Sequence, residues 1–212
     1  MIHALIVTAR AFGLWWHDFV LFIFFNLSWL LLQLPIVTGP PATAAMYVIA
    51  RRAADHELLD PRQGWHALRQ MLVPAWKWGL VNLVIVVTVV GNFYFYQNNV
   101  GTVWTILRLV WGAIAVVWFA LNLFYWPFWL AQRESDQKVL TTFRNSAVLL
   151  LKAPIFALTL VVLCALLIYT SLLLAIPLGA ALMAWIALIG IVAVDEELQR
   201  SKAQHSGVED VK

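Results

Sequence analysis

A long hydrophobic stretch lies near the start of the chain, where no charged side chain occurs from Phe19 to Ala50. These residues, about 32 in number, would form a helix near 48 Å long, well beyond a hydrocarbon core of about 30 Å. A Thr-Gly-Pro-Pro break interrupts them, and proline both lacks an amide donor and disfavours helix in the residue before it. The pattern therefore predicts a helical hairpin in which Phe19–Val37 crosses the membrane and Pro41–Ala53 returns.

The returning arm is short for a membrane crossing. A helix over Pro41–Ala53 reaches only about 20 Å, so its end must be buried in protein or re-entrant rather than left in lipid. The break is followed by four small residues, Ala42, Thr43, Ala44 and Ala45. Because small residues let helix backbones approach closely, we expect a short second helix that is packed inside the protein.

Three further apolar stretches are long enough to cross a bilayer, at Trp78–Tyr96, Val103–Leu130 and Ala153–Val194. The last is uncharged over about 42 residues and near 63 Å as a helix, so it requires two spans. Its turn is expected within Ser171–Gly179. The predicted fold class is all-α: a polytopic membrane bundle of six helices, the second short or re-entrant, with two amphipathic connectors.

The two connectors, Arg51–Lys77 and Gln132–Lys152, carry much of the positive charge. They hold nine of the 14 lysine and arginine residues, and the positive-inside rule places such segments in the cytoplasm. Pro61 can open a helix in the first connector. Apolar residues recur at helical spacing in both: Trp65, Leu68, Met71 and Leu72 in the first, and Val139, Leu140, Phe143, Ala147 and Leu150 in the second.

These charges also predict an orientation. Six crossings place both termini in the cytoplasm and the Thr38–Pro41 turn outside. If the Pro41–Ala53 arm lies flat on the cytoplasmic surface, five spans remain and the N-terminus is external. The expected organisation is an interfacial N-terminal segment over residues 1–18, one transmembrane domain over 19–194 and a cytoplasmic tail over 195–212.

Composition supports a membrane protein and indicates no catalytic chemistry. Hydrophobic residues make up 63% of the chain and charged residues 12%, against about 25% charged in soluble domains. Cys164 is the only cysteine, so no intrachain disulfide can form, and we expect it to be a packing residue. No phosphate-binding glycine loop, metal-ligand pair or carboxylate pair within a span is present, so we expect neither an enzyme nor a metal or cofactor, and nucleic-acid binding is not indicated.

The apolar stretch Val103–Leu130 carries an aromatic row with a seven-residue period: Trp104, Trp111, Trp118 and Tyr125. Arg108 and Asn122 belong to an adjoining row on the same helix face. This face could stack on a sugar ring or hold an anionic headgroup, because intramembrane charges often mark pathways or pairs. The alternative is a packing stripe buried by neighbouring helices, with Arg108 extending to the external interface.

Several amides lie inside the predicted spans: Asn26, Gln33, Asn82, Asn92 and Asn122. They can act as interhelical hydrogen-bond partners, each contributing about 0.6 kcal/mol. A second hypothesis is a small solute transporter or channel whose path is lined by Asn82, Asn92, Arg108 and Asn122.

The first hairpin also resembles a known family. The residues that carry the resemblance are Asn26, Trp29, Pro35, Ile36, Val37 and Thr38, followed by Pro41, Ala42, Thr43, Ala44, Ala45 and Tyr47. They look like the opening signature of the YesL-like bacterial integral membrane proteins. In that pattern a glycine directly precedes the proline before Ala-Thr-Ala-Ala, whereas here Pro40 holds that place and Gly39 lies one position earlier.

The resemblance implies a setting more than a mechanism. YesL-like proteins have no established biochemical activity and often accompany carbohydrate-uptake and polysaccharide-degradation systems. It therefore implies a multi-pass protein of the bacterial inner (plasma) membrane, an accessory component whose partners are the lipid bilayer and a membrane protein such as a sugar-uptake system.

Overall fold

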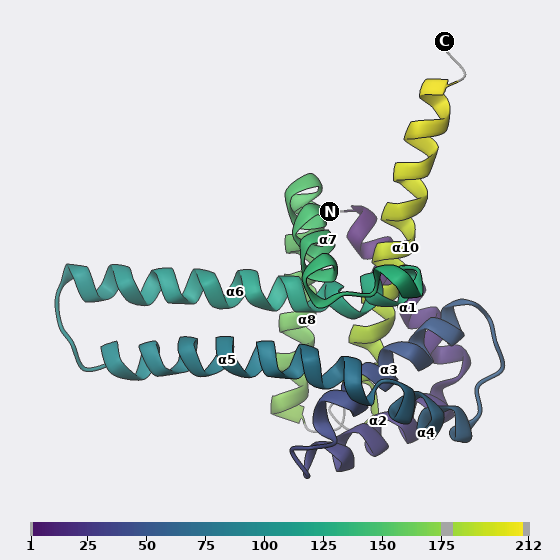
Figure 1. Cartoon of the computed structure of the whole chain (residues 1–212), viewed down its shortest axis with the longest axis horizontal. Helices are drawn as coiled ribbons and strands as arrows, with labels where there is room; N and C mark the ends of the chain where they lie inside the picture. The colour runs from purple at the N-terminus through teal and green to yellow at the C-terminus, as the bar shows by residue number, and fades with distance from the viewer. Residues whose placement is uncertain (1, 175–179, 210–212) are drawn as a thin grey trace.

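The computed structural model describes residues 2–174 and 180–209, and the regular secondary structure of this part of the chain is helical (Figure 1). No strand occurs in it, which confirms the all-α prediction. The helices are α1 (Ile2–His17), α2 (Phe19–Gln33), α3 (Gly39–Ala54), α4 (Pro61–Gln70), α5 (Leu72–Tyr96), α6 (Thr102–Ala131), a 3-10 turn η1 (Glu134–Asp136), α7 (Val139–Lys152), α8 (Pro154–Leu174) and α10 (Leu182–Glu209).

The α2–α3 pair forms the predicted helical hairpin, although α2 ends at Gln33 rather than Val37. The Thr38 hydroxyl closes the turn by donating to the Leu32 carbonyl at 2.6 Å and lies 3.0 Å from that of Pro35. Pro40 and Pro41 then fall in the first turn of α3, where a missing amide costs nothing because those donors have no intrahelical acceptor.

As expected for the short second helix, α3 lies inside the protein. It packs against α2, α4, α5, α6 and α10. Its buried face is built largely from small side chains, including Ala42, Ala44, Ala45, Ala50 and Ala53. These residues allow the close helix approach that the sequence predicted, and α3 is therefore the central element of the fold.

The described helices confirm only part of the predicted set of membrane crossings. Among the described residues three helices, α5, α6 and α8, are long and apolar enough to cross a bilayer, and the α1–α2 pair makes a fourth candidate if its 96° bend lies within one span. Alone, α2 has 15 residues and α3 has 16, below the roughly 20 that a spanning helix needs. The described helices support a membrane protein but do not confirm a bundle of six membrane helices.

The α5–α6 pair is set apart from the remaining helices. The two helices run side by side away from the rest of the molecule, and α8 lies crosswise to them (Figure 1). The connection at residues 97–101 lies between the predicted spans Trp78–Tyr96 and Val103–Leu130. The turn predicted within Ser171–Gly179 is only partly seen, because α8 runs to Leu174 and residues 175–179 lie outside the described residues.

Both connectors contain the expected helices, but the residues that α7 buries in the second connector are not those of its predicted apolar face. α4 begins at Pro61 and is capped by the Asp60 side chain, which accepts from the Arg62 amide at 2.8 Å. On α7 the buried residues are Thr142, Ser146 and Leu149, whereas Leu140 is 82% exposed. Leu140 of the predicted apolar face therefore does not pack against the rest of the protein.

The last helix continues past the predicted end of the transmembrane domain. α10 is apolar as far as Val194 and then remains helical through the charged residues to Glu209. Residues at the start of the predicted tail, Asp195 and Glu196, are joined by ion pairs to α3 and α1. The first part of that segment therefore packs with the folded body.

Candidate functional site

The face of α6 that carries the aromatic row is turned toward α5 along much of its length. The Trp104 ring lies 5.4 Å from that of Tyr96, and the Tyr125 ring lies 6.1 Å from that of Trp78. Because Tyr96 and Trp78 stand at opposite ends of α5, the two helices are antiparallel and in contact at both ends. This register brings the sequence-predicted residues of α6 against those of α5.

Four side chains join the two helices through reciprocal hydrogen bonds, and we call them the Trp–Asn clasp: Trp78, Asn82, Trp118 and Asn122. The Trp78 indole N–H donates to Asn122 Oδ1 at 2.8 Å, and the Trp118 indole N–H donates to Asn82 Oδ1 at 2.9 Å. Each asparagine amide also donates to the backbone carbonyl of the tryptophan four residues earlier, at 3.0 Å and 2.8 Å. The clasp is therefore symmetric, with the same Trp-x-x-x-Asn motif on both helices.

The clasp pairs the side-chain hydrogen-bonding groups of these residues with one another or with the backbone. An indole N–H can only donate, and an asparagine side chain offers an acceptor oxygen and an amide nitrogen with two N–H donors. In hydrocarbon an unpaired polar group is costly, so mutual pairing lets two otherwise apolar helices carry these residues. This arrangement holds α5 and α6 together and engages both indole donors and one donor and one acceptor of each asparagine.

A cavity of about 350 Å³ adjoins the clasp. Besides the four clasp residues, its lining is apolar and comes from both helices: Ile85, Val86, Val89, Val90, Ala115 and Phe119. Its chemistry suits apolar groups, because the asparagines that reach it are already hydrogen-bonded.

The other sequence-predicted residues of this face do not join the clasp. Arg108 is partly exposed, and its guanidinium lies 3.3 Å from the Thr105 hydroxyl, while the Asn92 amide donates to the Thr88 carbonyl on its own helix. Trp111 is partly buried and has no ring contact or hydrogen bond among the described residues. The part of the aromatic face around Arg108 and Trp111 therefore lacks the hydrogen bonds between helices that Trp118 and Asn122 make.

At the inner end the aromatic row merges with a buried cluster formed by Trp78, Tyr125, Trp126, Trp129 and Phe143. Tyr125, Trp126 and Trp129 are at most 5% exposed, and the Tyr125 ring lies 4.7 Å from Phe143 on α7. The Tyr125 hydroxyl is buried without a hydrogen-bond partner among the described residues. Neighbouring helices cover the Tyr125 end of the aromatic row, as expected if the row is a packing stripe.

The residues that carry the family resemblance connect α2 to α3 and α10. The Asn26 side-chain oxygen accepts from the Met183 and Ala184 amides at 2.9 Å and 3.2 Å, at the start of α10. The Trp29 indole donates to Thr43 at 3.1 Å. Gly39 faces Gln33 so closely that an added Cβ would lie 2.9 Å from Gln33 Oε1.

The remaining residues of that turn place the start of α3. Pro35 is exposed, whereas Pro41 is buried. Pro40 lies against Gly79 of α5, where an added Cβ would be 3.0 Å from the proline ring. Taken together, these contacts are those of a structural turn motif.

A group of ion pairs ties three helices together at the opposite end of α3. Arg51 binds both carboxylate oxygens of Asp195 at 2.5 Å and 2.6 Å and lies 3.3 Å from Asp55. Arg10 binds Glu196 at 2.5 Å, and His3 lies 3.0 Å from the same carboxylate. Burial alone would lower the pKa of Arg51, but the hydrogen bonds and charges of Asp195 and Asp55 raise it above its ordinary value.

Two features of these sites were not predicted from the sequence. Sequence reasoning placed Asn82 and Asn122 in spans without pairing them with tryptophans, although the repeated Trp-x-x-x-Asn spacing at 78–82 and 118–122 was a usable signal. It also missed the pairing of Asp195 with Arg51, which lies 144 positions away in the sequence.

No group of three or more histidine, cysteine, aspartate or glutamate side chains suited to a metal ion occurs in the described part of the chain. Comparison of the chain with protein-family models, with curated proteins and with solved structures finds no match.

Proposed function

We propose that this chain is a non-enzymatic integral membrane component, accessory to carbohydrate uptake or utilisation. The proposal that the protein does not itself transport a solute is supported by the Trp–Asn clasp, because its side-chain hydrogen bonds are made within the α5–α6 pair. The link to carbohydrate uptake rests on the resemblance of Asn26–Tyr47 to YesL-like proteins. In this proposal the protein acts by binding a membrane partner.

The proposal includes a multi-pass topology in the plasma membrane. Six crossings, the second formed by α3, place both termini, α4 and α7 in the cytoplasm. The support for this orientation is the positive charge of the two connectors, together with the lack of lysine and arginine in the 97–101 loop.

The partner is tested by affinity purification of the tagged full chain from native membranes in mild detergent, with and without prior crosslinking. We expect sugar-permease subunits to copurify, and an unrelated multi-pass protein carrying the same tag is the control. Recovery of no such subunits after crosslinking, from cells growing on a polysaccharide, would contradict the accessory role.

A second candidate function is a small solute transporter or channel with a path near Asn82, Asn92, Arg108 and Asn122. The observation that favours it is the antiparallel register of α5 and α6, which brings Asn82 beside α6 and places Arg108 level with Asn92. Purified protein in liposomes would then move solute and lose flux in Arg108→Ala. Arg144→Ala on α7, where the side chain is exposed, is the matched control.

A further inference from the structure

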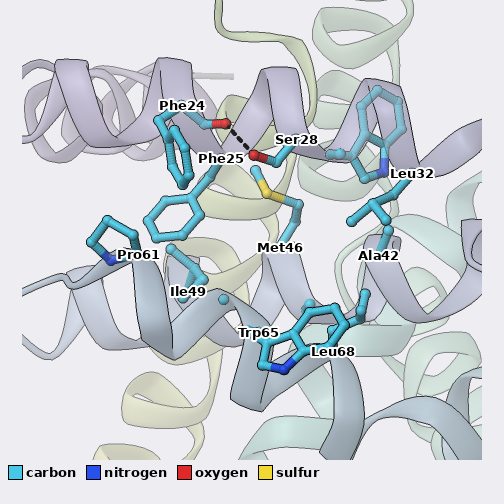
Figure 2. A pocket seen from close by; sticks show the side chains of 13 residues that line it. Phe24, Phe25, Ser28, Leu32, Ala42, Met46, Ile49, Pro61, Trp65 and Leu68 are labelled. Carbon is cyan, nitrogen blue, oxygen red and sulfur yellow. Dashed lines mark hydrogen bonds between the residues drawn. The ribbon is translucent and has the colours of Figure 1, made fainter.

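A pocket between α2, α3 and α4 is separate from the Trp–Asn clasp. It encloses about 290 Å³, close to the lower limit of about 300 Å³ for ligand sites. Figure 2 shows side chains from three helices turned toward a common space, with Phe24 and Ser28 on α2, Met46 and Ile49 on α3, and Trp65 and Leu68 on α4. The pocket is therefore built by the same hairpin that carries the family resemblance, together with the first connector.

The lining of this pocket is almost entirely apolar. The Ser28 hydroxyl is one of its few polar groups, and it donates to the Phe24 carbonyl at 2.8 Å. No charged side chain lines the pocket. A hydrocarbon chain suits such a lining, whereas a sugar or an ion would lose its hydrogen bonds to water without replacement.

The pocket is open to the surroundings on the side of α2 and α4. Phe24 and Trp65 line it and are 48% and 53% exposed. Leu27 and Leu31 lie on the same α2 helix and are also exposed, at 48% and 67%. An apolar helix surface of this kind faces lipid in a membrane protein, so an acyl chain can enter the pocket from the bilayer.

Positive charge stands beside this opening. The Arg69 guanidinium carbon lies 4.9 Å above the Trp65 ring, and this cation–π contact holds the charge next to a lining residue. Arg62 lies seven positions earlier, on the same face of α4. Neither arginine has an ion-paired carboxylate in the part of the chain that the structure describes.

We propose that the α2–α3–α4 pocket holds one acyl chain of an anionic phospholipid, whose phosphate is bound by Arg69 and Arg62. Basic residues on an amphipathic helix attract anionic headgroups, and a tryptophan beside them is typical of headgroup depth. The volume admits part of one acyl chain, and the apolar lining disfavours the polar headgroup, which stays outside with the arginines. Lipid binding at this pocket would join the hairpin to the first connector.

The test uses the full chain in nanodiscs that contain a trace of phosphatidylglycerol with a photoactivatable diazirine in one acyl chain. After illumination, peptide mapping should place the label on the α2 and α4 residues that line the pocket. Phosphatidylcholine with the same acyl chain should label this site about 25-fold less, since each of the two arginines near the surface contributes about a five-fold preference. Label elsewhere, or equal labelling by the two lipids, would overturn the proposal.

Two variants separate the acyl chain from the headgroup. Ser28→Phe fills the pocket and should reduce labelling by both lipids roughly ten-fold, since each excluded methylene loses about a four-fold contribution. Arg69→Gln should reduce the preference for phosphatidylglycerol about five-fold, with Arg62 retaining the rest, while leaving labelling by phosphatidylcholine unchanged.

Each variant has a matched control. Thr159→Phe changes an exposed hydroxyl residue on α8 that, like Ser28, donates to the carbonyl four residues earlier, and Arg144→Gln removes an exposed arginine on α7. Both control variants should be labelled by the two lipids to the same extent as the unchanged chain. If Ser28→Phe unfolds the protein, the mapped position of the label in the unchanged chain still decides the proposal.

Discussion

At the scale of single residues, the Trp–Asn clasp depends on the identities of its side chains. The indole offers one donor on a rigid ring, and asparagine can accept at its oxygen while its amide donates elsewhere. In the clasp the amide is directed to the helix's own backbone, which leaves the oxygen toward the partner helix. Phenylalanine retains the ring but loses the donor, so the hydrogen bond can be removed with little change in shape.

Trp118→Phe should therefore destabilise the α5–α6 pair through the lost hydrogen bond to Asn82. A double-mutant cycle with Asn82→Leu should give a coupling of about 0.6 to 1.7 kcal/mol, the range of membrane interhelical hydrogen bonds. The measurement is equilibrium unfolding of the purified protein in mixed detergent micelles. Trp111→Phe is the control, and an equal loss of stability in that variant would show that the donor is unimportant.

A second prediction concerns the ion pair between α3 and α10. Asp195→Asn keeps the shape but removes the charge from a partly buried carboxylate, and should cost about 1.5 to 3 kcal/mol, as for other hydrogen bonds to charged groups. Because the pKa of Arg51 is raised in the folded protein, the stability that it contributes is fully present below its ordinary pKa and is lost only as pH rises through the folded value. The difference in unfolding free energy between the two proteins should thus stay constant as pH is raised from 7 to 10.

Arg52→Gln is the control for this prediction, because Arg52 has no ion-paired carboxylate among the described residues. A loss of stability in Arg52→Gln equal to that in Asp195→Asn would indicate a general effect of charge at this end of α3.

At the scale of elements, the central contact between α10 and α6 depends on a glycine. A Cβ added at Gly190 would lie 2.9 Å from the Pro127 ring and 3.0 Å from the Leu123 carbonyl oxygen. A backbone oxygen cannot turn aside as a flexible side chain can, so the helices would have to separate. The closeness of α10 to α6 is therefore set at this one position.

Gly190→Ala should lower stability by about 1 to 3 kcal/mol through this overpacking. Gly91→Ala on α5 is the matched control, since nothing lies within 4 Å of an added Cβ there. Alanine is the better helix former by about 0.5 to 1 kcal/mol in water, so the control should be neutral or slightly stabilised. Thermal unfolding in detergent measures both, and an unaffected Gly190→Ala protein would contradict the packing seen here.

Sequence patterns predicted the elements better than their faces. Pro61 and the apolar stretch ending at Tyr96 correctly placed one end of α4 and of α5, because proline and the polar residues that follow Tyr96 act locally. The buried side of α7 could not be predicted, because Thr142 faces inward to hydrogen-bond with Gln132 at 3.1 Å. That choice depends on which helix lies opposite, and hydrophobic periodicity does not encode it.

At the scale of the whole molecule, the buried hairpin helix α3 joins the parts. It contacts α10 on one side and α4 and α5 on others, and small residues make these contacts close. Run length did not predict that α1 and α2 are joined by a 96° bend, because the pattern indicated only an interfacial segment followed by a span. The clasp, in contrast, was predictable from a repeated motif.

The proposed topology can be measured by cysteine labelling in intact cells. In a Cys164→Ala background, Asn98→Cys in the 97–101 loop should react with an impermeant thiol reagent, whereas Glu57→Cys in the first connector should react only after the cells are opened. Both positions are exposed, while Cys164 is fully buried. Labelling of Glu57→Cys in intact cells would overturn the orientation.

The short connection between α5 and α6 bears on how the chain assembles. Residues 97–101 link the two helices, and Gly101 opens α6 with a φ of 127°, which side chains other than glycine rarely adopt. A tether this short keeps the helices at a high effective concentration, in the millimolar range for flexible linkers. The two Trp-x-x-x-Asn motifs then meet through local contacts, which form faster than contacts between distant parts of a chain. The pair can thus form as its own folding unit soon after both helices enter the bilayer, before α10 has been synthesised.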